Sequence, residues 1–571
     1  MDMWTMNERR RGLEVINGER GPSLCIQNVT YLNSAFRTWE TGSIWIDGRR
    51  ILYIGPEEPP IEADETIDGT GKFAVPGYVE PHVHPSQLYT IETYAHFGSQ
   101  TGTTVYIADN LIPYMEMEER DAHRWLDHLQ QLPEQIYSWV RFDSQTRSAE
   151  EADVFNEDRI ASWLKREDVL LGGELTAWPA LMNGSPRLEA MMGAMKQRRL
   201  KVEGHLPGAS ERTLVRMRLL GVDGDHESMT IEDVRHRLQH GYAVTLRYSS
   251  IRPDLPHLLR AIREKGWDVW DRLMMTTDGS TPLFHKKGLM NELIEIALQE
   301  GIDPIDAYHM ASYNVARYYD RLDEFGQLTT GCLATLNILN DPNDPTPVDV
   351  LAKGQWLVRE GEVVERRRVL DWSNVRPFTS VPCTAADFEW TSPDGIELVN
   401  DVITKRYEST VDRTLDAIPP SFDESYLLVI GRDGTWRVNT MLKGFGAIEG
   451  LASSYSTSGD FVIIGTSKVA MRRAYEAMCE AGGGIFLADE SNVQAYIPLP
   501  IGGRLPDLSF EDIRPFEQRV RTYAKEKGYR LGDFIYTLLF LQSTHLPYVR
   551  ITPEGLIDVL TGESFVLSEK R

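Results

Sequence analysis

Short apolar segments alternate with helix-like segments after residue 76, and this alternation constrains the fold more than any other feature. The eight predicted strands cover residues 77–83, 103–108, 137–142, 169–174, 201–205, 222–226, 243–247 and 273–278. Alternation of this kind is typical of a parallel sheet, because each return to the sheet needs a crossover helix. Eight units in about 240 residues predict a (β/α)8 barrel. An open doubly wound sheet is the alternative, but no G-x-G-x-x-G turn follows the first predicted strand.

The segments on either side of the predicted barrel are rich in strand-like patterns. Residues 23–76 contain alternating apolar runs and a hairpin signal at Asp47-Gly48. Residues 325–370 return to the same kind of pattern. We therefore expect a TIM-like barrel over residues 77–324, inserted in a small split β-sandwich domain.

The two ends of the chain differ from this central part. Residues 1–22 are polar and lack the apolar core of a signal peptide, so they are expected to form a short lead. Residues 385–571 mix strand-like and helix-like segments and predict a separate C-terminal α+β domain.

Composition narrows the classes of partner and the cellular compartment. The chain of 571 residues carries a formal net charge of −25, which disfavours nucleic acid and anionic membranes as partners. No run approaches the ~18 apolar residues of a membrane span. Four scattered cysteines fit a reducing cytoplasm. We expect a cytoplasmic protein with a small-molecule substrate, and a homo-oligomer is the usual arrangement for enzymes of this size.

Residues of metal-binding type follow several predicted strands at the point where each strand ends. The candidates are His82 and His84 after the first strand, Glu174 after the fourth, His205 after the fifth, His226 after the sixth and Asp278 after the eighth. In a barrel of this kind the carboxyl ends of all strands meet on one face, where active sites lie. One histidine alone is more often a hydrogen-bonded structural residue. Together, the six residues predict a site for two metal ions, with Glu174 between them.

Three further polar residues are weaker candidates. Glu227 follows the ligand candidate His226 and is expected to orient a ligand or to contact substrate. The alternative for Glu227 is a carboxylate at the start of a helix, where the helix dipole stabilises it. His96 and His285 are candidates for the residues around substrate.

The motifs around these residues resemble those of the adenine deaminases, within the amidohydrolase superfamily. PGYVEPHVH, VEGHLPGAS and GVDGDHESMT carry the likeness in the barrel, and KGFGAIEGLASS and EAGGGIFLADESNVQAYIPLPIGG carry it in the C-terminal region. The resemblance covers nearly the whole chain. It implies metal-dependent hydrolysis of adenine to hypoxanthine and ammonia. Asp278, a ligand candidate at the end of the eighth strand, is expected to be the proton shuttle, and Glu227 is a second candidate catalytic residue. It also favours Mn(II) or Fe(II), while the ligand types suit Zn(II) as well.

The chain departs from the family pattern beside the ligands rather than at them. The departures are Glu80-Pro81 before the first histidine, Pro85-Ser86-Gln87-Leu88 after the second, Asp109-Asn110-Leu111-Ile112 after the second strand, Gly279 after Asp278, and Tyr455-Ser456-Thr457-Ser458 in the C-terminal region. The residues that bind substrate are therefore not assigned. Two alternatives to adenine deamination stay open: hydrolysis of another aminoheterocycle, cyclic amide or N-acyl compound, and a binding protein that keeps the fold without catalysis.

Overall fold

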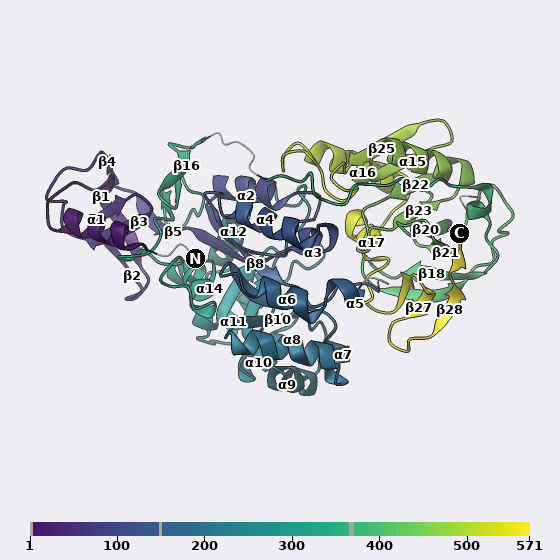
Figure 1. Cartoon of the computed structure of the whole chain (residues 1–571), viewed down its shortest axis with the longest axis horizontal. Coiled ribbons are helices and arrows are strands. Elements are labelled where there is room, and N and C mark those ends of the chain that lie inside the picture. The colour runs from purple at the N-terminus through teal and green to yellow at the C-terminus, as the bar shows by residue number, and fades with distance from the viewer. Residues whose placement is uncertain (1–3, 148–150, 365–369, 420) are drawn as a thin grey trace.

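A computed structural model describes residues 4–147, 151–364, 370–419 and 421–571 (Figure 1). The first residues of the predicted lead (1–3) and the end of the predicted split domain (365–369) lie outside the described residues. Figure 1 shows a β-rich part with the first strands at one end, the barrel in the middle and the C-terminal region at the other end. Among the described residues, none of the helices combines the length and the apolar character that crossing a bilayer requires.

The central sheet is a parallel barrel, as the alternating pattern predicts. Its strands, in the order in which they pair, are β13 (Leu273–Thr276), β12 (Ala243–Arg247), β11 (Gly224–Asp225), β10 (Lys201–Gly204), β9 (Val169–Leu175), β8 (Gln135–Val140), β7 (Thr103–Ala108) and β6 (Tyr78–Val83). Side chains close the gap between β13 and β6: the Thr276 hydroxyl lies 2.7 Å from the carbonyl oxygen of His82 and 2.6 Å from the Glu80 carboxylate. The eight predicted strands are thus all present, and β8 lies two residues earlier than predicted.

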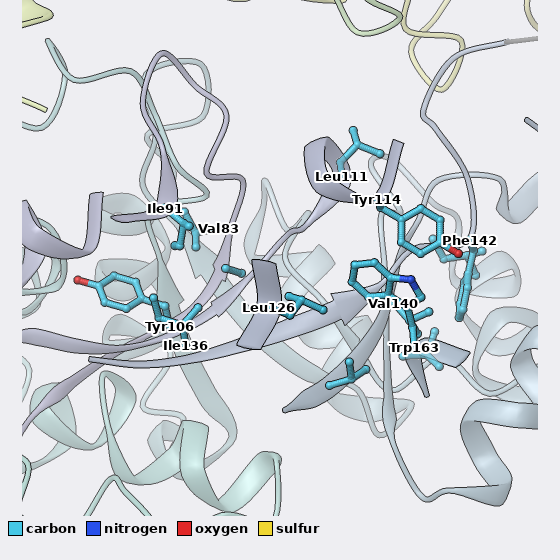
Figure 2. Close-up of a cluster of buried hydrophobic side chains, with 14 of the residues drawn as sticks. Val83, Ile91, Tyr106, Leu111, Tyr114, Leu126, Ile136, Val140, Phe142 and Trp163 are labelled. Carbon is cyan, nitrogen blue, oxygen red and sulfur yellow. The ribbon is translucent and has the colours of Figure 1, made fainter. Parts of the chain in front are cut away.

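Amphipathic helices cover the outside of the barrel. The longer ones are α2 (Ile91–Gln100), α4 (Glu119–Leu129), α8 (Pro186–Gln197), α9 (Glu211–Leu219), α10 (Ile231–Gln239), α11 (Leu255–Glu264) and α12 (Met290–Gln299). In α11 the buried residues are Leu255, Leu258, Leu259 and Ile262, the spacing of a single helix face. Figure 2 shows part of the resulting core, where side chains of the barrel strands meet those of the surrounding helices.

A second sheet joins strands that precede the barrel to strands that follow it. Its members are β1 (Leu24–Asn33), β2 (Thr38–Asp47), β3 (Arg50–Gly55), β4 (Glu65–Asp68), β5 (Phe73–Pro76), β14 (Leu336–Leu339), β15 (Asp349–Ala352), β16 (Gln355–Arg359) and β17 (Glu362–Val363). The junction is the antiparallel pair of β5 and β14, in which Pro76 lies opposite Leu336. The barrel is therefore an insertion between two parts of one sheet. Before β1, the predicted lead contains helix α1 (Met6–Ile16).

The C-terminal region is built of mixed helices and strands, in agreement with the predicted α+β class. Its larger sheet contains β18 (Asp394–Leu398), β19 (Thr404–Glu408), β20 (Glu424–Ile430), β21 (Trp436–Lys443), β22 (Gly450–Ser453), β23 (Phe461–Gly465), β24 (Gly484–Ala488), β25 (Val493–Pro498) and β29 (Glu569–Lys570). A smaller sheet contains β26 (Val549–Thr552), β27 (Gly555–Asp558) and β28 (Ser564–Leu567), and the helices are α15 (Lys468–Glu480), α16 (Arg514–Glu526) and α17 (Phe534–Phe540).

A buried carboxylate on the barrel anchors this C-terminal region. Glu116, the last residue of α3 (Leu111–Glu116), lies 2.7 Å from Arg432 Nη1 and 3.1 Å from Arg504 Nη1. Burial opposes ionisation of Glu116, but Arg504 and Arg432 lower its pKa below the ordinary value. The two parts of the chain are thus joined by a charged contact around a buried carboxylate.

Glu116→Gln is expected to destabilise the protein by about 3–5 kcal/mol, because it removes the carboxylate charge that pairs with the buried guanidinium of Arg504. The first thermal unfolding transition of the protein should fall by roughly 5–10 °C. Glu118→Gln, which changes an exposed carboxylate two residues away, serves as the control and should leave the transition unchanged. Equal transitions in both variants would contradict the anchoring role of Glu116.

Candidate metal centre

The first predicted ligand group lies where β6 and β13 end. His82 Nε2 lies 3.2 Å from Asp278 Oδ1, and His84 Nε2 lies 3.5 Å from the same oxygen. These three residues offer atoms close enough to one another to hold one metal ion. His84 Nε2 also lies 3.5 Å from Glu174 Oε2, so the carboxylate at the end of β9 borders this group.

The second predicted ligand group lies on the other side of Glu174. His205 Nδ1 lies 2.5 Å from Glu174 Oε1, and His226 Nε2 lies 3.2 Å from it. One oxygen of Glu174 thus faces each histidine group. The structure brings all six predicted ligands together, and it places Glu174 between the two groups as a bridging carboxylate would lie.

Local backbone geometry directs these side chains to one point. Side chains alternate along a strand, so Glu80 and His82 of β6 point to the same side, into the barrel. At the end of β13 the chain turns sharply, with Asp278 at φ +56° and Gly279 at φ +75°. A Cβ atom at position 279 would lie 2.8 Å from the hydroxyl of Tyr89, so a second aspartate does not fit here without displacing that ring. This packing explains one departure from the family pattern.

The buried ligand atoms lack ordinary hydrogen-bond partners. Within the described part of the chain, both ring nitrogens of His82 and of His205, Nε2 of His226 and Oδ1 of Asp278 have no partner in hydrogen-bond geometry, although carboxylate oxygens lie near three of these nitrogens. Buried polar atoms are normally paired, so a cluster of unpaired ones requires an explanation. Imidazole nitrogens and carboxylate oxygens are the donors that zinc, iron(II) and manganese(II) accept, and the donor set therefore fits a metal centre.

Electrostatics keeps the carboxylates of the cluster ionised. Burial alone would raise the pKa of Asp278, but Arg247, whose Nη2 lies 2.6 Å from Oδ2, together with His82 lowers it well below the ordinary value. Burial opposes ionisation of Glu174 in the same way, and His205 nevertheless lowers the pKa of that carboxyl well below its usual range. Burial and the neighbouring His226 lower the pKa of His82 to about 3, so its imidazole is neutral at neutral pH.

A further acidic residue orients one of the histidines. Asp109, just after β7, lies with Oδ2 2.9 Å from His84 Nδ1 and with Oδ1 3.5 Å from the buried guanidinium of Arg141. A carboxylate on the second nitrogen of a metal-binding histidine fixes the ring and raises its basicity. In the sequence Asp109 belongs to a departure from the family pattern, but its place at a strand end is a signal of a role in the site.

Asp109→Asn is expected to weaken metal binding and to lower activity by about 10- to 100-fold, because the neutral amide polarises His84 less and positions it less firmly. The apparent metal affinity, measured by titration of the metal-free protein, checks this expectation. Asp127→Asn, at an exposed carboxylate paired with Arg166, is the matched control. Wild-type affinity in Asp109→Asn would show that His84 needs no such support.

Glu227 lies in the wall of the centre, but its environment differs from that of a free carboxylate. Arg247 Nη1 lies 2.8 Å from Oε1, and Arg252 Nη1 lies 2.6 Å from Oε2. Oε1 is also 3.3 Å from His226 Nε2. Burial is outweighed by His205 and the two arginines, so the pKa of Glu227 is well below its ordinary value. Helix α10 begins only at Ile231, so Glu227 is not a residue at the start of a helix.

A cavity of about 640 Å³ lies above these residues, between the barrel and the C-terminal region. Barrel residues that line it include His84, Gln145, Glu174, His205, Arg247 and Asp278. Its other wall comes from the C-terminal region and includes Tyr455, Tyr536, Phe540 and His545. Neither His96 nor His285 is among the described residues that line it. Buried His285 instead packs beside Tyr94 and Phe510, which accounts for its place in the core.

Comparison with known proteins agrees with this geometry. The amidohydrolase family model matches residues 73–357, and the adenine deaminase C-terminal domain model matches residues 401–563. The chain is 43% identical to "Putative adenine deaminase YerA" of Bacillus subtilis, over 98% of this chain and 97% of that protein. Two proteins of Oceanobacillus iheyensis are also similar: "Putative adenine deaminase OB0751" at 41% identity, over 97% of both chains, and "Adenine deaminase" at 27%, over 98% of both. The chain therefore belongs to the amidohydrolase family, in the group whose members carry the adenine deaminase C-terminal domain.

Proposed function

We propose that the chain is a metal-dependent aminohydrolase that converts adenine and water to hypoxanthine and ammonia. The observation that carries this proposal is the position of Glu174 between two histidine groups, with Asp278 beside them at the floor of the cavity. Membership of the amidohydrolase family, whose enzymes hydrolyse C–N bonds, supports the same reaction class.

The six ligand residues would hold two divalent ions, one near His82, His84 and Asp278 and one near His205 and His226, with Glu174 shared. Bound divalent metal lowers the pKa of water and so supplies hydroxide near neutral pH. Mixed histidine and carboxylate ligands suit Mn(II), Fe(II) and Zn(II), and the family resemblance favours the first two.

Asp278 is the residue that moves the proton in this proposal. Its Oδ1 faces the ligand nitrogens and its Oδ2 is held by Arg247, so the carboxylate is ionised and fixed in direction. It accepts a proton from the attacking water and delivers it to the departing amine. The C6–N bond of adenine breaks, a C6–O bond forms and ammonia leaves. Glu227, clamped by two arginines, orients His226 and Arg247 rather than carrying a proton.

A second candidate is the same hydrolysis on a different aminoheterocycle. Tyr455, at the position where the family carries a histidine-rich run, lines the cavity and donates its hydroxyl hydrogen to Gln87 Oε1 at 2.6 Å. Both residues belong to the departures from the adenine deaminase pattern. Of the two Oceanobacillus iheyensis relatives, the one named "Adenine deaminase" is the less similar to this chain, at 27% identity against 41%.

Ammonia release from a panel of substrates distinguishes the two candidates. Enzyme loaded with Mn(II) is assayed with adenine, other aminopurines, aminopteridines and cyclic amides. The first candidate predicts that adenine has the highest kcat/KM. A higher value for another aminoheterocycle would favour the second, and release from none of them by fully metal-loaded protein would contradict both.

A further inference from the structure

The roof of the cavity brings one histidine of the C-terminal region close to the ligand cluster. His545 follows α17 in the chain and lines the cavity. Its ring lies edge-to-face on that of His205, with centroids 5.2 Å apart and planes at 85°. A residue nearly 270 positions beyond Asp278 thus reaches the space in which the proposed reaction takes place.

The backbone of Gln145 fixes the direction of this ring. His545 Nδ1 lies 3.2 Å from the carbonyl oxygen of Gln145. A carbonyl only accepts, so the ring hydrogen lies on Nδ1, and in the neutral imidazole Nε2 keeps a free lone pair. Nε2 has no hydrogen-bond partner among the residues that the structure describes.

Gln145 also ties the roof to the ligand cluster. It adopts the left-handed backbone region, with φ +64°, which is uncommon for a residue with a side chain. Its side-chain Nε2 donates to Glu174 Oε2 at 2.8 Å, while its carbonyl also accepts from the backbone N–H of Thr544 at 3.1 Å. Next to it, the Thr146 hydroxyl donates to the carbonyl of Gln542 at 2.8 Å. His545 is therefore held at a fixed place relative to Glu174.

Several other polar groups of the cavity are already engaged. Arg247 and Arg252 hold Glu227, and the Gln145 amide holds Glu174. The Tyr536 hydroxyl donates to the carbonyl oxygen of Gly279 at 3.2 Å. The lone pair of His545 Nε2 remains as a hydrogen-bond acceptor beside the ligand cluster.

We propose that His545 Nε2 accepts a hydrogen bond from the amino group of the substrate and so positions the carbon that is attacked. The inference rests on the proposed deamination: the amino group is bonded to the reacting carbon, which must lie beside the ligand cluster, and it carries N–H donors. A specificity-determining residue would then come from the C-terminal region, not from the barrel.

Three substitutions of His545 distinguish the loss of the Nε2 hydrogen-bond acceptor from the loss of the ring's structural contacts. His545→Asn keeps an N–H near the Nδ1 position but removes the acceptor, His545→Gln reaches the Nε2 position with an amide oxygen, and His545→Phe removes both. Tyr548→Phe, at an exposed side chain of the same segment, is the control. The probes are adenine, followed by ammonia release, and purine, which lacks the amino group and is measured as a competitive inhibitor.

His545→Asn and His545→Phe are expected to lose about 10-fold in kcat/KM for adenine, the size of one hydrogen bond, and His545→Gln to recover part of it. The inhibition constant of purine and the metal content should stay at the wild-type values in all variants. Equal losses for adenine and purine, or unchanged kcat/KM in His545→Asn, would overturn the inference. Absence of adenine turnover by the metal-loaded wild-type enzyme would instead overturn the proposed function, and this inference with it.

Discussion

Asp278→Asn is expected to lower kcat for ammonia release by about 10³-fold, within the range that a positioned acid–base group contributes. The amide keeps an oxygen for the ligand cluster and a similar shape, but it cannot accept a proton from water. In the native protein Arg247, 2.6 Å from Oδ2, holds the carboxylate in its ionised form, so the substitution removes the one charge state that the mechanism uses. Steady-state kinetics with adenine, together with metal analysis, measures this effect.

The control for this substitution is Asp271→Asn, at a carboxylate that is 53% exposed and pairs with Arg317 just before β13, at the other end of the strand. It should retain wild-type kinetics and metal content. If Asp278→Asn keeps activity within about 3-fold of wild type, Asp278 is not the proton shuttle. If Asp278→Asn loses its metal completely, the loss of activity reflects a lost metal ligand and not a lost proton carrier. Recovery of activity at high metal concentration would then contradict the assignment of Asp278 as the proton carrier.

Glu174→Gln is expected to reduce bound metal from two ions to at most one and to abolish turnover. Glu174 places one oxygen toward His84 and the other toward His205 and His226, so the loss of its charge affects both groups. Metal sites need deprotonated ligands, and a neutral amide bridges two cations poorly. Metal analysis after dialysis, combined with the ammonia assay, checks both parts of the expectation.

Glu189→Gln, at an exposed carboxylate of α8, is the matched control and should bind metal as the wild type does. Two ions per chain in Glu174→Gln, with turnover preserved, would show that Glu174 does not hold the centre together. One ion with preserved turnover would show that the second ion has no part in the chemistry.

Much of the fold and the positions of the candidate ligands could be predicted because both depend on local sequence patterns. A buried parallel strand is a short apolar run, and its carboxyl end is where a barrel places polar side chains. His205 directly follows β10 and His226 directly follows β11, and the structure places both beside Glu174. The predicted start of β8 is two residues too late. Gln135 and Ile136 are buried like the rest of the strand, but the polar residues before them obscure this pattern in the sequence.

The residues around the cavity could not be predicted in the same way, since their positions depend on tertiary contacts. His545 and Gln145 are 400 positions apart in sequence, and only the packing of the C-terminal region on the barrel brings them together. Arg247 ends β12, but an arginine at a strand end does not by itself indicate a partner such as Asp278. In the sequence Gly279 is only a departure from the family pattern. The structure gives the reason, because a Cβ atom at this position would lie too close to the Tyr89 hydroxyl.

Titration of metal-free protein with Mn(II), followed by adenine deamination, tests the two-metal account most directly. The ligand geometry predicts that ammonia release rises with added metal and reaches its maximum at two ions per chain, because Glu174 faces two groups of histidines. Maximal release at one ion per chain, or release that does not depend on metal, would contradict a shared two-metal centre.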